Sequence, residues 1–172
     1  SLERLPESMV ILGAGPIAIE MAQAFCRLGT NVSVVQRSGQ ILSKEDRDMA
    51  DGVMDILAAE GVEFHMNSSV LEVKESCNRK EVIIKNSKNE TNSLKAEQIF
   101  VAMGRSPNLT DLKPENAGIE FDRKGVNVDA RMRTSQKHIY AAGDVTGKYQ
   151  FTHAAGYEGG IVISNAIFHL PR

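Results

Sequence analysis

Two glycines set between an apolar segment and an amphipathic one constrain this chain more than any other feature. Apolar residues 9–12 lead into Gly13 and Gly15, a helical pattern runs as far as Gly29, and a second apolar segment covers 32–35. This order predicts a strand, a glycine turn, a helix and a second strand, within the roughly 30 residues of a βαβ unit. We expect the helix to bury one apolar face, made up of Ile17, Met21, Phe25 and Leu28.

Each residue of the glycine turn has its own role in this prediction. Gly13 allows the sharp turn, and Gly15 has no Cβ, so a pyrophosphate can approach the backbone. Pro16 suits a first helical turn because its φ is preset, and Ala18 is small enough for close packing of helix on strand. The free amides and positive dipole end of the helix would face a phosphate. The turn therefore predicts dinucleotide binding, the alternative being an ordinary strand-to-helix turn.

The residues after the second predicted strand bear on which dinucleotide binds. An acidic residue about 20 positions after the glycines usually contacts the ribose 2′-hydroxyl of NAD. Here the strand ends in Gln36, Arg37 and Ser38 instead. Arg37 can pair with a 2′-phosphate, and Ser38 can donate a hydrogen bond to it. We therefore expect NADPH to be preferred over NADH; the alternative is that Arg37 is only a solvated residue at a strand end.

Composition narrows the class of protein. The 172 residues are 42% hydrophobic and 24% charged, which predicts a packed core. A formal net charge of −2 argues against a general nucleic-acid binder, and no apolar run reaches the ~18 residues that a membrane span needs. Cys26 and Cys77 are far apart, which predicts two reduced thiols in a cytoplasmic protein rather than a disulfide or a metal site.

Hydrophobic spacing predicts the elements that follow. Residues 43–46 fit a capped helix start, and the helix would bury a stripe made up of Met49, Val53, Ile56 and Leu57. Residues 62–66 alternate as a third parallel strand. We then expect a turn at 77–80 and short antiparallel strands at 70–73, 82–84 and 94–96.

A uniformly apolar strand at 99–102 is expected in the centre of the parallel sheet, which would place Gly104 at a ligand-binding edge. Beyond Pro107, we expect a short strand at 126–128, an apolar strand at 138–144 and a helix from about 152 to 169. So little apolar mass is not expected to form a core of its own.

Taken together, these residues resemble the pyridine nucleotide–disulfide oxidoreductase family, which includes dihydrolipoamide dehydrogenase, glutathione reductase and mercuric reductase. The matching segments are 13–20, 102–108, 139–144 and 152–159. The resemblance implies an α/β fold with a Rossmann-like three-layer NAD(P)-binding domain over 1–108, in which a parallel sheet is joined by an antiparallel β-meander. Residues 109–172 would be an incomplete, returning segment of an FAD-binding domain.

The resemblance also implies roles for single residues. Gly13 and Gly15 would hold the pyrophosphate, with Pro16, Ile17 and Ala18 completing the turn. Gln36, Arg37 and Ser38 would face the adenosine ribose. The remaining nucleotide contacts would come from Glu20 near the nicotinamide carboxamide, Val70 near adenine and Gly104 in the cofactor groove. On the residues alone, without the motif, Glu20 is better explained as an exposed helix residue.

In the flavin segment, the resemblance assigns Asp144 to the ribityl chain of FAD and places Thr152 and His153 beside the flavin. On the residues alone, Asp144 is explained equally well as a turn aspartate that follows Gly143. The family's paired redox cysteines, its first FAD motif and its dimer-forming interface domain have no counterpart here. We therefore expect no catalytic residue and no turnover, and as partners a nicotinamide nucleotide and the missing FAD and interface domains of a homodimeric parent.

Two other functions stay open. The chain could come from an NADH oxidase, a ferredoxin-reductase-type flavoprotein or a flavin monooxygenase, which share the paired nucleotide motifs. It could also be a non-enzymatic nucleotide sensor, although the apolar surface expected over 109–172 argues against that.

Overall fold

The computed structural model describes residues 3–76 and 79–168 of the chain. Contacts between residues divide it into two compact units, unit 1 (Ser1–Gly104) and unit 2 (Arg105–Arg172), each of which is described by itself.

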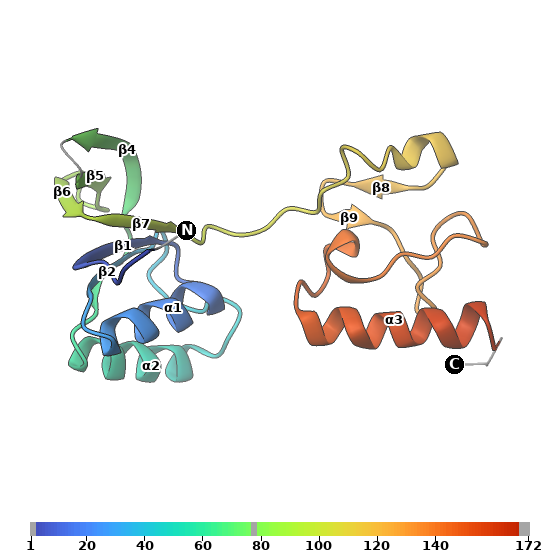
Figure 1. Cartoon of the computed structure of the whole chain (residues 1–172), viewed down its shortest axis with the longest axis horizontal. Coiled ribbons are helices and arrows are strands. Elements are labelled where there is room, and N and C mark those ends of the chain that lie inside the picture. The colour runs from blue at the N-terminus through green and yellow to red at the C-terminus, as the bar shows by residue number, and fades with distance from the viewer. Residues whose placement is uncertain (1–2, 77–78, 169–172) are drawn as a thin grey trace. The chain divides into compact units, whose positions relative to one another are not determined.

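Unit 1 is built on a four-stranded parallel sheet in the order β3-β2-β1-β7 (Figure 1). Its strands are β1 (Ser8–Leu12), β2 (Asn31–Val35), β3 (Glu63–His65) and β7 (Gln98–Val101). Helix α1 (Pro16–Arg27) connects β1 to β2, and helix α2 (Arg47–Ala59) connects β2 to β3. Because neighbouring strands are parallel and joined through helices, the predicted βαβ unit and third parallel strand are confirmed.

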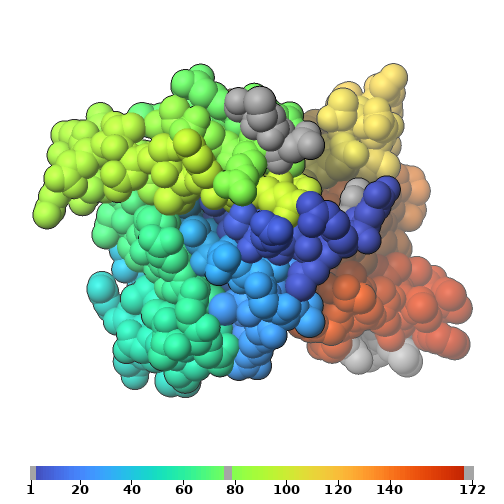
Figure 2. Space-filling view, turned by 60° about the vertical axis from the view of Figure 1, so that its left-hand side comes forward, coloured from blue at the N-terminus to red at the C-terminus, as the bar shows by residue number. Residues whose placement is uncertain are grey.

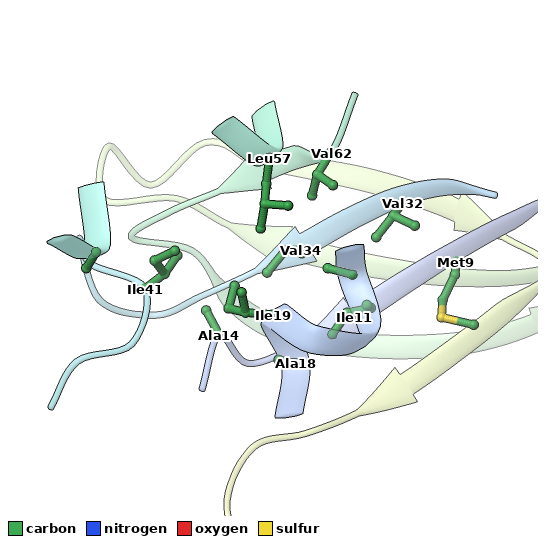
Figure 3. Close-up of a cluster of buried hydrophobic side chains, with 12 residues drawn as sticks. Met9, Ile11, Ala14, Ala18, Ile19, Val32, Val34, Ile41, Leu57 and Val62 are labelled. Carbon is green, nitrogen blue, oxygen red and sulfur yellow. The ribbon is translucent and has the colours of Figure 1, made fainter. Parts of the chain in front are cut away.

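Strand β1 is apolar from Met9 to Leu12, and these four residues are buried because both faces of the sheet are covered. Side chains alternate along a strand, so Met9 and Ile11 face the helices while Val10 and Leu12 face the opposite layer. The cluster on the helix side is drawn in Figure 3 and is made up of Met9, Ile11, Ala14, Ala18, Ile19, Ala22, Val32, Val34, Ile41, Ala50, Leu57 and Val62. This cluster is the larger of the two cores and fixes α1 and α2 on the sheet.

An antiparallel meander covers the other face of the sheet. Its strands are β4 (Ser69–Ser76), β5 (Arg79–Lys85) and β6 (Thr91–Ala96), in the order β4-β5-β6. Val82, Ile84 and Ala96 pack against the residues of β1 and β2 that point away from the helices. Figure 2 shows the green meander and the blue to cyan helices on opposite sides of unit 1. The three-layer fold is thus confirmed, and the three strands of the meander are longer than the sequence predicts.

The predicted turn at 77–80 is correct only in part. Arg79 and Lys80 belong to β5, where they pair with β4 and β6, while Cys77 and Asn78 lie outside the described residues. Two further strand predictions in this region are confirmed, since β4 contains 70–73 and β6 contains 94–96.

Two expectations about burial are wrong. The strand expected at 99–102 in the centre of the sheet is β7, an edge strand, and Val101 near its end is 64% exposed. The predicted helix stripes also fail in part, because four of their members are exposed: Ile17, Leu28, Met49 and Ile56. The physical reason is that both helices lie close to the sheet and bury small residues, Ala18 and Ala22 in α1 and Ala50 in α2, so several longer side chains point outward.

Unit 2 has little regular structure apart from one long helix. In chain order it contains 3₁₀ turn η1 (Pro114–Ala117), a two-strand hairpin of β8 (Phe121–Asp122) and β9 (Gly125–Val126), 3₁₀ turn η2 (Gly143–Thr146) and helix α3 (Thr152–Ala166). The predicted helix is confirmed, although it ends earlier. The hairpin and the remaining segments are held by close backbone approaches, as at Gly147, where a Cβ would overlap the Lys124 carbonyl.

The strand predicted at 138–144 does not form. Among the described residues, this segment forms one isolated antiparallel bridge, between Tyr140 and Arg133. The 3₁₀ turn η2 then begins at Gly143. The strand expected at 126–128 likewise shortens to β9, which ends at Val126. An apolar segment becomes a strand only when a neighbouring strand takes up its backbone hydrogen bonds, and the described part of unit 2 offers these segments little pairing.

The packing of the meander on the sheet yields a stability prediction. Ile84 is 2% exposed between the two layers, so replacing it with Ala should lower the free energy of unfolding by about 2–5 kcal/mol. Leu71→Ala is the matched control, since Leu71 belongs to the same meander but is 56% exposed. Urea denaturation of both variants checks this, and equal losses would contradict the packing described here.

Candidate functional site

The turn between β1 and α1 is shaped by Gly13. Its φ is +102°, in the left-handed region, and a Cβ at this position would lie 2.4 Å from the Ala102 carbonyl oxygen. Its amide donates to the Val35 carbonyl at 2.8 Å. The turn is therefore held against the ends of β2 and β7, at the carboxyl edge of the sheet where ligands bind in open α/β folds.

Gly15 has the opposite surroundings. It is the N-cap of α1 with an extended backbone, and a Cβ placed on it would have no atom within 4 Å. Its carbonyl accepts the first helical bond from the Ile19 amide at 3.0 Å, and none of the side chains that the structure describes caps the helix. Pro16 follows at the first helical position, and Ile17 is 45% exposed beside it. Open backbone at the positive end of a 12-residue helix suits a phosphate or pyrophosphate.

Ala18 is fully buried against β1 and β2, so it sets how closely α1 lies on the sheet and does not face the open space at Gly15. Its backbone amide still belongs to the first turn of the helix. Three residues of the turn, Gly13, Ala14 and Ala18, are therefore packed against the rest of unit 1. Gly15, Pro16 and Ile17 are partly or fully exposed and border the open space.

The loop after β2 contains Gln36, Arg37 and Ser38. The side-chain amide of Gln36 donates to the Ser38 hydroxyl at 2.8 Å, and that hydroxyl donates to the backbone carbonyl of Gln40 at 3.1 Å. Arg37 is exposed and has no ion-pair partner among the residues that the structure describes. A serine hydroxyl has one proton, so Ser38 could donate to a phosphate only by giving up its bond to the Gln40 carbonyl.

The other nucleotide candidates of unit 1 are Gly104, Val70 and Glu20. Gly104 follows β7 with φ +117° and open space around it, and Gly13 lies against the Ala102–Met103 backbone just before it. Val70 is partly buried and packs against the core cluster on the meander side, which includes Val35 at the end of β2. Glu20 is exposed on α1, one turn beyond Pro16.

The flavin candidates all belong to unit 2. Asp144 is exposed in η2, and its carboxylate lies 3.4 Å from the Arg105 guanidinium, which also donates to the Gln150 carbonyl at 3.0 Å. Thr152 and His153 are exposed at the start of α3, where the His153 ring stacks on Phe151 with 5.4 Å between ring centroids. Arg105 is a contact of Asp144 that sequence reasoning missed.

Glu158 is a second residue without a predicted role. It is 5% exposed within α3, and its carboxylate accepts a hydrogen bond of 2.6 Å from the Gly143 amide, directly before Asp144. The signal that could have found it is a single acidic residue among small and apolar residues in the predicted helix. A buried carboxylate needs a donor, and the nearest glycine turn supplies one.

Within the described part of the chain, no group of three or more His, Cys, Asp or Glu side chains is placed to hold a metal ion. None of the helices described there has both the length and the apolar character needed to cross a membrane.

Comparison with known proteins gives consistent results. Residues 1–159 match the family model described as pyridine nucleotide-disulphide oxidoreductase. Dihydrolipoyl dehydrogenase of Bacillus subtilis is 39% identical over 96% of this chain and 36% of its own length, and mercuric reductase of Staphylococcus aureus is 35% identical over 96% of this chain and 30% of its own.

Solved structures agree with these sequence matches. The HOCl-induced flavoprotein disulfide reductase RclA from Escherichia coli is similar with a TM-score of 0.88 and 34% identity, over 100% of this chain and 39% of that chain. The chain thus spans about a third of the length of the relatives it matches. With 159 residues matched by the family model and a shared fold, this chain belongs to the pyridine nucleotide–disulfide oxidoreductase family.

Proposed function

We propose that this chain is the NAD(P)H-binding portion of an FAD-dependent oxidoreductase that passes a hydride from NAD(P)H to FAD and on to a disulfide or a similar acceptor. Residues 1–108 are proposed as the nucleotide-binding domain and 109–172 as a segment of the FAD-binding domain. The observation that carries the proposal is the uncovered backbone at Gly15, where a helix begins and nothing fills the space that a side chain would occupy.

The nicotinamide nucleotide would supply the hydride, and the residues of unit 1 would bind and orient it. Backbone amides at Gly15 and the following turn suit the pyrophosphate, and the fixed close contact at Gly13 keeps them in place. The exposed Glu20 carboxylate can accept a hydrogen bond from a carboxamide, and Ile17 offers an apolar surface beside it. Gly104 leaves room for a ligand at the end of β7.

We infer NADPH rather than NADH as the preferred nucleotide. None of the three residues directly after β2, Gln36, Arg37 and Ser38, is acidic, so they add no negative charge that would repel a 2′-phosphate. The exposed Arg37 guanidinium is available to pair with one.

Unit 2 is proposed to contribute to flavin binding through Asp144, whose carboxylate can accept hydrogen bonds from hydroxyl groups of the ribityl chain, with Thr152 and His153 nearby. The relatives include both a dihydrolipoyl dehydrogenase and a mercuric reductase, which suggests that the shared third of these proteins serves the nucleotide and flavin rather than the final acceptor. The remaining FAD and interface domains, the homodimeric state and a cytoplasmic location are proposed for the parent enzyme.

The open space at Gly15 is tested by filling it. Gly15→Ala should fold normally, because φ at this position is −77° and the new methyl meets no protein atom, yet it should raise the Kd for NADPH about tenfold or more by crowding the pyrophosphate. Gly52→Ala is the control, since Gly52 lies in α2 and is equally uncrowded. Calorimetric titration gives the Kd values; unchanged affinity in Gly15→Ala would remove the central support for this site.

The nucleotide preference is tested at Arg37. Arg37→Ala should weaken NADPH binding by about tenfold, the loss of one charge-assisted pair, and should leave NADH binding within about twofold. Arg123→Ala, which removes an exposed arginine from unit 2, serves as the control for net charge. Tighter binding of NADH than NADPH by the unaltered chain would contradict the proposed preference.

The expected lack of turnover is tested by spectroscopy. The purified chain should carry no flavin absorption band and should not oxidise NADPH in the presence of added FAD and a disulfide acceptor, because Asp144 alone cannot hold the ADP half of FAD. As the control, the chain is refolded in the presence of free FAD, and unbound flavin is then removed by buffer exchange. A yellow preparation that retains its flavin after gel filtration would show this expectation to be wrong.

A further inference from the structure

The loop that follows β2 contains a closed network of side-chain hydrogen bonds. The side-chain amide of Gln36 donates to the Ser38 hydroxyl at 2.8 Å and to the Gln40 carbonyl at the longer distance of 3.4 Å. The Ser38 hydroxyl donates to the same carbonyl at 3.1 Å. A serine hydroxyl has one proton, so Ser38 cannot donate to a ligand without breaking this bond.

Backbone contacts hold the same loop against the connection between β3 and β4. The Gln36 amide donates to the His65 carbonyl at 3.0 Å, and the Ser68 amide donates to the Gln36 carbonyl at 2.9 Å. The Asn67 amide donates to the Ser38 carbonyl at 3.2 Å. Both residues that flank Arg37 are therefore fixed through main chain and side chain.

Arg37 differs from its two neighbours. Gln36 and Ser38 are half-buried and hydrogen-bonded to each other, whereas Arg37 is exposed and makes no ion pair with any described residue. Two bonded residues on either side of an unengaged arginine leave its backbone few orientations, which reduces the conformational entropy lost when the guanidinium engages an anion.

We infer that Gln36, Ser38 and the Gln40 carbonyl form a brace that presents Arg37 to the 2′-phosphate of NADPH, so that Ser38 is a positioning residue acting through Arg37 and not a phosphate ligand. This inference rests on the proposed function and deepens it by naming which residue reads the phosphate and which residues hold the reader in place. In this inference the preference for NADPH over NADH comes from one residue in the loop, Arg37, which is held in place for the phosphate.

The experiment measures Kd values for NADPH and NADH by calorimetric titration of the whole chain, in the unaltered form and in five variants: Ser38→Ala, Gln36→Leu, the double variant of these two, Arg37→Ala, and Ser38→Ala combined with Arg37→Ala. Ser38→Thr keeps the hydroxyl and should restore the NADPH affinity. Ser164→Ala is the matched control, because the Ser164 hydroxyl also donates to a backbone carbonyl, that of Gly160, but within α3.

A brace makes distinct predictions for this set. Ser38→Ala and Gln36→Leu should each weaken NADPH binding about three- to tenfold, the double variant should be no weaker than either, and NADH binding should hardly change. In the Arg37→Ala background, Ser38→Ala should have no further effect on NADPH. A loss that persists in that background, or a silent Gln36→Leu, would mean that Ser38 contacts the phosphate directly and would overturn the inference.

Failure of the proposed function has a different signature. If the unaltered chain binds neither nucleotide, the proposed function fails. If it prefers NADPH and Ser38→Ala keeps the full preference, the proposed function stands and the brace alone is wrong. Equal weakening of NADH and NADPH in Ser38→Ala would also overturn the brace, because it would show a general structural effect.

Discussion

The organisation of unit 1 depends on one steric constraint, the contact between Gly13 and the end of β7. The chain can leave β1 at this angle only because Gly13 takes a positive φ, and the turn can lie this close to Ala102 only because there is no Cβ. The same contact sets where α1 begins and hence where its uncapped amides point. The turn is thus tightly packed at Gly13 and open at Gly15, two residues further on, where a ligand can approach the backbone.

The covering of both sheet faces follows from the same arrangement. Helices α1 and α2 occupy one face, and the meander closes the other with Val82, Ile84 and Ala96. Burial on both sides accounts for the four consecutive apolar residues 9–12 of β1, while the candidate binding residues lie beyond the carboxyl ends of the strands. The candidate residues after β1, β2 and β7 therefore collect at one edge of the sheet without any long excursion of the chain.

Much of this was predictable from sequence, and the failures have physical reasons. The order of strands and helices followed from glycine positions and from periods of 2 and 3.6, because local pattern determines local structure when both sheet faces are buried. The exposure of Ile17 and Met49 was not predictable, since the spacing of apolar residues does not tell which of two helix faces approaches the sheet. Ala18 and Ala50 decided it through close packing.

In the candidate site too, local sequence predicts some features, while others depend on how distant or looping segments pack. Gly13 and Gly15 are identifiable from their spacing, because the backbone geometry they allow is intrinsic to glycine. The engagement of Ser38 by Gln36 and Gln40 depends on how a loop folds back on itself, and the partnership of Glu158 with Gly143 joins residues fifteen positions apart across unit 2. The strand expected at 138–144 failed for a related reason: strand formation depends on a neighbour, which a pattern of apolar residues cannot supply.

The bond from the Gly143 amide to Glu158 has a mechanical consequence. It ties the peptide just before Asp144 to the middle of α3, at a position that water does not reach. The position of the peptide before Asp144 is therefore coupled to the position of Glu158 on α3 through this one hydrogen bond.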